Sequence, residues 1–250
     1  MSRDYYYLSF TPPGELSGSM LLNGFPISEA RLPARTTRMD MLNMSLCGAR
    51  NLLQIDLSSV DGSAFALKLE LKAHAPDSIV TPSSGRAIPI SDAAQPPGGF
   101  ALQSDPHGRL TFQGGFATPG LDFSDLFFRG LPVDRAAAAL FARQVVQAFE
   151  ARAIEPLLGW HERLIRDVAV ARGISAAEAL AGMREEIEEA LSIGLPPGWA
   201  QQPISFRPWC DGRLLEAVVS SDRPLIKTVG GEMDMPCFIA QVDGRLQVVR

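Results

Sequence analysis

Basic tracts, paired cysteine motifs and long hydrophobic runs are all missing from this sequence of 250 residues, and each absence excludes a class of protein. No stretch approaches the roughly 20 apolar residues that a membrane-spanning helix needs, so no membrane contact is expected. Lys and Arg number 23 against 28 Asp and Glu, which gives a net charge of -5. Because nucleic-acid binding relies on clustered basic side chains, no nucleic-acid partner is expected either.

Cysteine is scarce and is not arranged in a redox or metal motif. Cys47, Cys210 and Cys237 are widely separated, are odd in number and form no CxxC pair. This pattern indicates buried, reduced thiols in a reducing compartment. An acidic residue directly follows Arg3, which is unlike the start of a secretory signal peptide, so a cytoplasmic location is expected.

The signatures of cofactor and metal chemistry are missing as well. The sequence contains no phosphate-binding loop, no dinucleotide fingerprint and no nucleophile elbow. Its three histidines, His74, His107 and His161, lie far apart, and none is four residues from another as in a helical zinc motif. We therefore expect no cofactor and no metal, and we assign no catalytic residue on this basis.

Residues 1–117 follow the pattern of an antiparallel β-sandwich, either immunoglobulin-like or jelly-roll-like. Turn signals such as Asn23-Gly24 separate the expected strands. The clearest alternation lies in the segment 64–71, where one face of the strand would carry Phe65, Leu67, Leu69 and Leu71. Five prolines in residues 75–99 predict a long loop, with a short strand near Ala87–Ile90.

Residues 118–133 are interpreted as a segment that connects two domains. The segment is rich in glycine and proline, but it also carries large apolar residues that a free linker would not have. One interpretation is that these residues join the two domains, and another is that Phe127 and Phe128 form a hook for a partner. The phenylalanine-rich stretch Phe123–Phe128 also suggests a third class of function, a structural subunit of a larger assembly.

Residues 134–250 predict an α+β domain that begins with helices. Asp134 is suited to cap the first helix, and Pro156 is expected to end it. The predicted buried stripe of this helix comprises Phe141, Val145 and Phe149, with Leu140 near the same face. A second helix is expected to run from Leu157 to a stop at Gly173.

The last predicted helix begins with a capping box, and antiparallel strands follow it. In the box, Ser175 and Glu178 are placed to satisfy two free backbone amides reciprocally. The buried stripe of this helix is expected to comprise Leu180, Met183, Ile187 and Leu191. Strand patterns separated by Asp-Gly turns then continue to residue 250, which predicts helices packed on one face of a curved antiparallel sheet.

The final segment Phe238–Arg250 consists of an apolar strand, the turn Asp243-Gly244 and a short strand that closes in arginine. With the preceding helices and strands, it resembles the cystatin-like cone superfamily, which includes the SnoaL-like proteins. The resemblance covers about residues 134–250. It implies a cone of helices and curved sheet, a fold that hosts enzymes, small-molecule binders and protein-interaction modules.

One candidate partner-binding site is an acidic helix face. It is formed by Glu185, Glu186, Glu188 and Glu189, which would attract a basic protein because complementary charge speeds encounter and sets specificity. Phe127 and Phe128 complete the predicted partner contacts. A solvated surface is the alternative interpretation of the glutamates.

A second candidate site is catalytic. His161 and Glu162 lie on a predicted helix that would line the cavity of a cone fold. A histidine beside an acid in an apolar pocket could act as a general base with its orienting group. The alternative interpretation is that His161 and Glu162 simply face water.

Two functions from different classes therefore remain. The leading hypothesis is a non-catalytic protein-binding module of a bacterial cytoplasm, such as an adaptor, a chaperone or a toxin-neutralising protein, with a protein partner that is basic. The alternative is a small-molecule enzyme, an isomerase, dehydratase or hydrolase, that uses a cavity in the C-terminal domain with His161 as the base.

Overall fold

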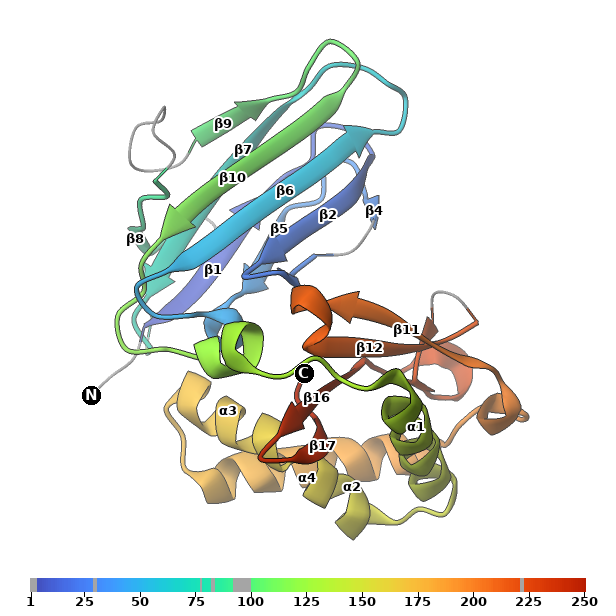
Figure 1. Ribbon diagram of the computed structural model, residues 1–250. Coiled ribbons are helices and arrows are strands. Elements are labelled where there is room, and N and C mark those ends of the chain that lie inside the picture. Colours follow the sequence, from blue (N-terminus) through green and yellow to red (C-terminus); the bar gives the residue numbers. More distant parts are fainter. Residues whose placement is uncertain (1–3, 29–30, 77, 82–83, 92–99, 221–222) are drawn as a thin grey trace. The chain divides into compact units, whose positions relative to one another are not determined.

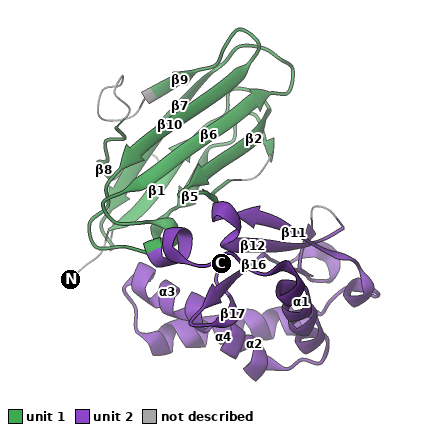
Figure 2. Ribbon diagram, in the orientation of Figure 1, with its two compact units in different colours: residues 1–124 green, residues 125–250 purple. Residues whose placement is uncertain are grey.

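The computed structural model describes residues 4–28, 31–76, 78–81, 84–91, 100–220 and 223–250. The chain divides into two compact units, residues 1–124 (unit 1) and residues 125–250 (unit 2), shown in Figure 2. Antiparallel sheets come first, helices follow in residues 135–193, and another antiparallel sheet ends the chain, so the predicted α+β class is confirmed. Among the described helices, none combines the length and the hydropathy needed to cross a membrane.

Unit 1 is made of strands, one short 3-10 turn at Asn43–Ser45 and their connections. The strands are β1 (Tyr5–Phe10), β2 (Leu16–Leu22), β3 (Phe25–Pro26), β4 (Arg31–Leu32), β5 (Arg38–Met41), β6 (Asn51–Ser59), β7 (Ala66–His74), β8 (Arg86–Ala87), β9 (Phe100–Gln103) and β10 (Arg109–Phe116). One sheet has the order β5-β1-β7-β8, with β9 also paired to β7. The other has the order β10-β6-β2-β3, with β4 also paired to β2. Figure 1 shows the two sheets as two layers.

The alternation predicted for the strand β7 is present. Leu67, Leu69 and Leu71 are 0%, 0% and 3% exposed, and they therefore belong to the core of unit 1. On the opposite face, Lys68 Nζ pairs with a carboxylate oxygen of Glu70 at 2.6 Å. The expected short strand near residues 87–90 corresponds to β8, Arg86–Ala87, which starts one residue earlier and ends three residues earlier. Parts of the proline-rich segment 75–99, including residues 92–99, lie outside the described residues.

The segment 118–133, predicted to connect two domains, is divided between the two units. Its first half belongs to unit 1, because Gly48 N donates to Leu121 O at 2.7 Å and Phe123 N donates to Leu46 O at 2.8 Å. A π-helical turn, Asp125–Arg129, then opens unit 2. Leu121, Phe123, Leu126 and Phe127 are buried, whereas Phe128 and Leu131 are 47% and 67% exposed. Most large apolar residues of this segment therefore pack within folded units, unlike those of a free linker.

Unit 2 begins with four helices, α1 (Arg135–Glu150), α2 (Ile154–Trp160), α3 (Glu162–Arg172) and α4 (Ala176–Ile193). The predicted caps are confirmed. Asp134 Oδ1 accepts from Ala136 N at 2.9 Å at the start of α1, and the reciprocal capping box at Ser175 begins α4. Gly173 ends α3 in a left-handed conformation with φ of 68°, which glycine adopts without strain.

The prediction that Pro156 ends the first helix is wrong. Helix α1 ends at Glu150, and the chain turns at Arg152, whose φ is 53°. Pro156 lies in the first turn of α2 instead. A proline is tolerated there because the amides of a first helical turn have no carbonyl partner within the helix.

The second half of unit 2 is an antiparallel sheet with short additional ladders. Its strands are β11 (Ile204–Trp209), β12 (Leu214–Val219), β13 (Arg223–Pro224), β14 (Ile226–Lys227), β15 (Asp234–Met235), β16 (Cys237–Val242) and β17 (Arg245–Val248). The order is β11-β12-β16-β17, with β13 paired to β12 and with β14 and β15 as a separate pair. Short 3-10 turns lie at Trp199–Gln201, Cys210–Gly212 and Val229–Gly231. Helices and sheet share one apolar core, which includes Phe149, Ile187 and Ile239.

Two leucines predicted to be buried are exposed. Leu140 on α1 is 67% exposed and Leu180 on α4 is 41% exposed. On α1 the adjacent Phe141, 6% exposed, takes the core position, and on α4 the adjacent Ala179, 4% exposed, does so. Neighbouring positions on a helix point about 100° apart, so the hydrophobic residue next to a core position can turn toward water.

Candidate functional site

The structure buries the predicted catalytic histidine. His161 lies between α2 and α3, is 7% exposed, and its Nδ1 lies 2.7 Å from Leu157 O. Burial lowers the pKa of His161 below its ordinary value, which favours the neutral ring. The cavity that His161 lines, beside Phe149 and Ile187, has a volume of about 20 Å³, enough for about one water molecule. The other predicted residue, Glu162, is exposed and is not among the residues that line this cavity.

The residues predicted to contact a partner differ in their exposure to solvent. Glu185, Glu186, Glu188 and Glu189 are all exposed on α4. The neighbouring Arg184 pairs with Glu155 at 2.8 Å and lies 3.9 Å from Glu188, so this face also carries a positive charge. Two further residues were predicted to contact a partner. Phe128 is 47% exposed, whereas Phe127 is 0% exposed and its side chain offers no surface to a partner.

A mostly apolar groove lies on unit 2 where α1, α2 and β17 meet. We call it the Leu140 groove; it has a volume of about 460 Å³ and is lined chiefly by Ala137, Leu140, Phe141, Trp160, Arg245 and Leu246. The Phe141 and Trp160 rings meet edge to face, with centroids 5.6 Å apart and an interplanar angle of 73°. Figure 1 shows α1, α2 and β17 within unit 2.

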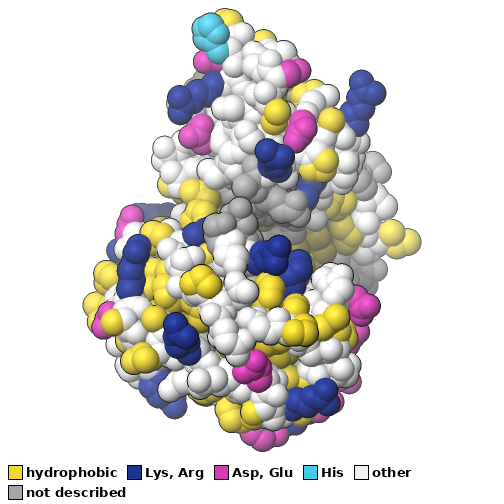
Figure 3. Space-filling view, turned by 90° about the vertical axis from the view of Figure 1, so that its right-hand side faces the viewer, with side chains coloured by type: hydrophobic (Ala, Val, Ile, Leu, Met, Phe, Trp, Pro, Cys, Tyr) yellow, Lys and Arg dark blue, Asp and Glu magenta, His cyan; other side chains and the backbone are white. Residues whose placement is uncertain are grey.

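Exposed apolar side chains occur elsewhere on the surface, so Leu140 must be judged together with its surroundings. Figure 3 shows hydrophobic side chains scattered among charged ones on the face that it draws, which is ordinary for a folded protein. Leu140 differs because it borders a hollow with an aromatic floor. Gly159 also lines this hollow and is exposed, and a Cβ added there would meet no atom within 4 Å, so a side chain has room at that point.

The charged group of the groove is an arginine. Arg245 is exposed on the β17 side and forms no ion pair with any described residue. Arg143 is also exposed, likewise forms no ion pair within the described parts of the chain, and follows Leu140 by three residues on α1. Side chains three apart on a helix are neighbours, so Arg143 adds positive charge beside Leu140.

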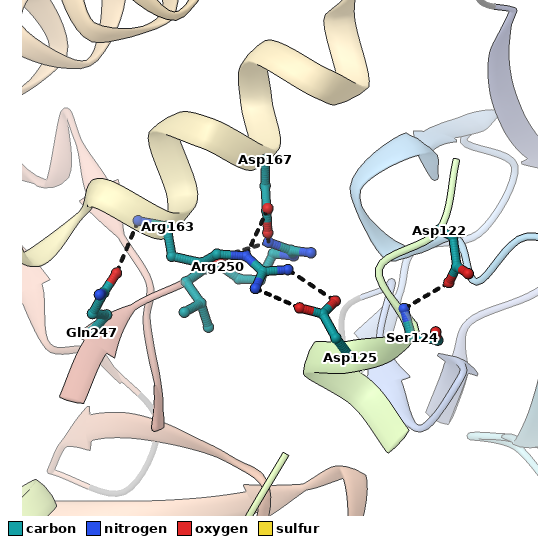
Figure 4. A network of polar contacts seen from close by, with 8 residues as sticks. Asp122, Ser124, Asp125, Arg163, Asp167, Gln247 and Arg250 are labelled. Atoms are coloured by element: carbon teal, nitrogen blue, oxygen red, sulfur yellow. Dashed lines mark hydrogen bonds and ion pairs between the residues drawn. The ribbon is translucent and has the colours of Figure 1, made fainter. Parts of the chain in front are cut away.

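Beside the groove, unit 2 holds a buried network of two arginines and two aspartates, shown in Figure 4. We call Asp125, Arg163, Asp167 and Arg250 the arginine network. Arg163 donates through Nε to Asp167 Oδ1 at 2.7 Å, and through Nη1 and Nη2 to the two carboxylate oxygens of Asp125 at 2.7 and 3.0 Å. Arg250 Nη1 donates to Asp167 Oδ2 at 2.7 Å. The side chains of Arg163, Asp167 and Arg250 are 9%, 4% and 5% exposed.

The arginine network is suited to holding elements in place and not to proton transfer. Hydrogen bonds from Arg163 hold the pKa of Asp125 below its ordinary value, so this carboxylate stays ionised, and guanidinium groups do not act as bases. Arg163 also donates its backbone N–H to Gln247 Oε1 at 2.9 Å, and Gln247 lines the Leu140 groove. The network therefore fixes α3 against β17 at one wall of the groove.

No protein-family model, curated protein or solved structure matches this chain. Among the described residues, no group of three or more His, Cys, Asp or Glu side chains is placed to hold a metal ion.

The residues of the groove are ones that sequence reasoning missed. The sequence pattern places Leu140 near the buried stripe of its helix, and it places Arg245 and Gln247 in the final strands. A signal for Leu140 does exist in the sequence, because Leu140 and Phe141 are adjacent and a single stripe cannot bury both fully. Nothing in the sequence indicates that β17 would lie beside α1 and α2.

Proposed function

We propose that this protein is a non-catalytic protein-binding module and that the Leu140 groove is its main contact surface. The proposal rests on the exposure of Leu140, which is 67% exposed at the edge of an apolar groove of about 460 Å³. Burying a leucine fully contributes about 1.5–3 kcal/mol, so covering the exposed part of Leu140 would contribute about 1–2 kcal/mol. A partner that covers the groove gains this energy together with contact to the aromatic floor.

A small-molecule enzyme is the alternative that the groove has to be weighed against. The volume of the Leu140 groove falls in the range of pockets that bury small ligands, roughly 300–1,000 Å³. Acid–base catalysis needs a positioned proton donor or acceptor, however, and Arg245 is the charged residue among the described lining residues. His161 lines a different cavity, with room for about one water. The composition of the groove therefore favours binding over turnover.

The acidic face of α4 remains a second proposed contact, for a basic partner. Glu185, Glu186 and Glu189 are exposed and form no ion pair with described residues, so their charge is available to a partner. Charge at the rim of an interface chiefly raises the association rate. We assign this face a role in steering a basic partner, separate from the anchoring contact at the Leu140 groove.

The finer fold and the location of the protein are also proposals. The two layers of unit 1 support a β-sandwich, for which the immunoglobulin-like and jelly-roll-like forms both stay open. The order of unit 2, four helices followed by an antiparallel sheet, supports a cystatin-like arrangement. An adaptor, chaperone or toxin-neutralising role in a bacterial cytoplasm is the setting that we propose for it.

Site-specific photo-crosslinking tests the contact surface. A photoreactive phenylalanine derivative replaces Leu140 in the full chain, which is then irradiated in its native cells. The same residue at Leu180 serves as the control, because Leu180 is also an exposed leucine on a helix of unit 2. We expect one protein to be crosslinked from position 140 and not from position 180.

The affinity of the purified pair then decides the proposal. Leu140→Asp should weaken binding at least tenfold, the equivalent of about 1.4 kcal/mol, whereas Leu180→Asp should leave it unchanged. Gly159→Met adds a long side chain among the residues that line the groove, and Gly182→Met is its control, since both glycines are exposed and a Cβ at either meets no atom within 4 Å. Equal crosslinking at both positions, or equal binding by Leu140→Asp and Leu180→Asp, would show that the groove is not the contact surface.

A further inference from the structure

We infer that the occupant of the Leu140 groove is an acidic segment of a partner protein that presents one large apolar side chain. This inference rests on the proposed function. The apolar side chain packs on Leu140 and Trp160, and a carboxylate close to it in the partner pairs with Arg245. The partner surface is therefore opposite in charge to the one that the glutamates of α4 would attract.

The charge at the groove carries the assignment. The chain as a whole has a net charge of -5, but the groove is flanked by positive charge. Arg143 is exposed on the helix turn of Leu140, and Arg245 is exposed on the opposite wall. Neither arginine forms an ion pair with a described residue, so both can pair with a partner. Asp243, two residues before Arg245, lines a separate hollow with Arg163 and Arg213. A guanidinium binds a carboxylate with two parallel hydrogen bonds, which gives direction as well as energy.

The shape and lining of the groove limit the apolar part of the occupant. A volume of about 460 Å³ admits a short peptide segment or a few side chains of a larger partner. Phe141 is buried, and the half-buried Trp160 ring, whose centroid lies 5.6 Å from that of Phe141, is the aromatic surface of the groove that favours an aromatic or large aliphatic side chain. Gln144 also lines the groove and is exposed, and its side-chain amide can form hydrogen bonds with a peptide backbone.

Selection of displayed peptides tests the chemistry without knowledge of the natural partner. A library of random 12-residue peptides is selected on the full-length protein, and a parallel selection uses Arg245→Glu. On the wild-type protein we expect peptides that combine Asp or Glu with Trp, Phe, Leu or Met. On Arg245→Glu we expect the acidic residues to disappear from the selected set, because the charge that pairs with them is reversed.

Synthetic copies of one selected peptide then give the magnitudes. Arg245→Glu should weaken its binding about tenfold, and raising the salt concentration should weaken wild-type binding because the pair is exposed to solvent. Leu140→Asp should weaken binding at least 30-fold, and Leu180→Asp should not. Each variant is checked for an unchanged far-ultraviolet circular dichroism spectrum, because Trp160 lies in the groove and its emission can change in a folded variant. Gly159→Met replaces Leu140→Asp if the latter does not fold.

The possible outcomes separate this inference from the proposed function. If the peptides bind the wild-type protein, Leu140→Asp and Arg245→Glu equally, the groove is not a binding site. The proposed function and the acidic occupant are then both wrong. If binding requires Leu140 but the peptides show no acidic bias or ignore Arg245→Glu, the proposed function stands and the acidic occupant is wrong. If light scattering shows a dimer that Leu140→Asp disperses, the occupant is a second copy of this chain, and this inference is overturned.

Discussion

Replacing Asp167 by asparagine should destabilise unit 2 strongly while leaving unit 1 unchanged. The Asp167 side chain is 4% exposed and accepts hydrogen bonds from Arg163 and Arg250, each at 2.7 Å. Asparagine has nearly the same shape, so packing is retained and the change is one of charge. Arg163 would keep its pair with Asp125, whose side chain is 54% exposed, and the buried Arg250 would lose its ion pair with Asp167.

The expected magnitude follows from the burial of the two arginines. Breaking a buried ion pair by removing one partner typically costs about 3–5 kcal/mol, because a charge is left in a poorly solvated place. With a urea dependence of about 2 kcal/mol per molar for a domain of this size, the midpoint should fall by about 1.5–2.5 M. Glu155→Gln is the matched control, since Glu155 pairs with Arg184 but is 76% exposed, and its loss should cost under about 1 kcal/mol.

The distribution of aromatic residues allows each unit to be followed separately. All three tryptophans, Trp160, Trp199 and Trp209, lie in unit 2, and all three tyrosines, in Tyr5–Tyr7, lie in unit 1. Tryptophan emission therefore reports the unfolding of unit 2, and tyrosine absorbance reports that of unit 1. A tryptophan midpoint for Asp167→Asn within about 0.3 M of the wild-type value would refute the argument from buried charge.

Three further predictions concern titration, thiols and surface charge. Burial lowers the pKa of His161 from its ordinary value of 6.5, so the stability of unit 2 is full above that value and is lost as the pH falls toward the lowered pKa. The tryptophan urea midpoint should thus drop between about pH 7.5 and pH 5.5, and less so in His161→Gln; a flat profile would contradict this. Burial raises the pKa of both Cys210 and Cys237 to about 12, so a thiol reagent should leave both unmodified in the native protein and modify them in urea. Reversing the charge of Glu185 and Glu189 to lysine should slow association with a basic partner about tenfold with little effect on its dissociation, and unchanged association would remove the steering role.

Local signals predicted much of the architecture. The capping box at Ser175, the cap at Asp134 and the stop at Gly173 each depend on backbone amides and carbonyls within a few residues, and all three are present. Pro156 shows the limit of such signals, because a proline can follow one helix or lie in the first turn of the next. The turn at Arg152 places Pro156 in the second helix, and the local sequence does not indicate that turn.

The candidate site could not be predicted in the same way, because its residues come together only through tertiary packing. Arg163 and Asp167 have the spacing of a helical ion pair, but their partners Asp125 and Arg250 lie 38 and 83 residues away. Leu140 and Phe141 are both apolar and adjacent, so periodicity does not decide which of them faces the core. Phe141 is covered by Trp160 and the elements around it, and Leu140 is left at the edge.

The arginine network and the groove should therefore be coupled. Arg163 holds Gln247 through its backbone amide, and Gln247 lines the groove, so a network that no longer fixes Arg163 leaves β17 less firmly placed. Asp167→Asn should then weaken binding of a groove-selected peptide severalfold, measured without urea at a temperature where tryptophan emission shows unit 2 to be folded. The destabilised control needed here is Ser175→Ala, which removes the cap of α4 at a cost of about 1 kcal/mol and touches no groove residue. If Asp167→Asn binds as tightly as Ser175→Ala, the network supports the stability of unit 2 alone, and the groove is positioned by the apolar contacts of Phe141, Trp160 and Leu246.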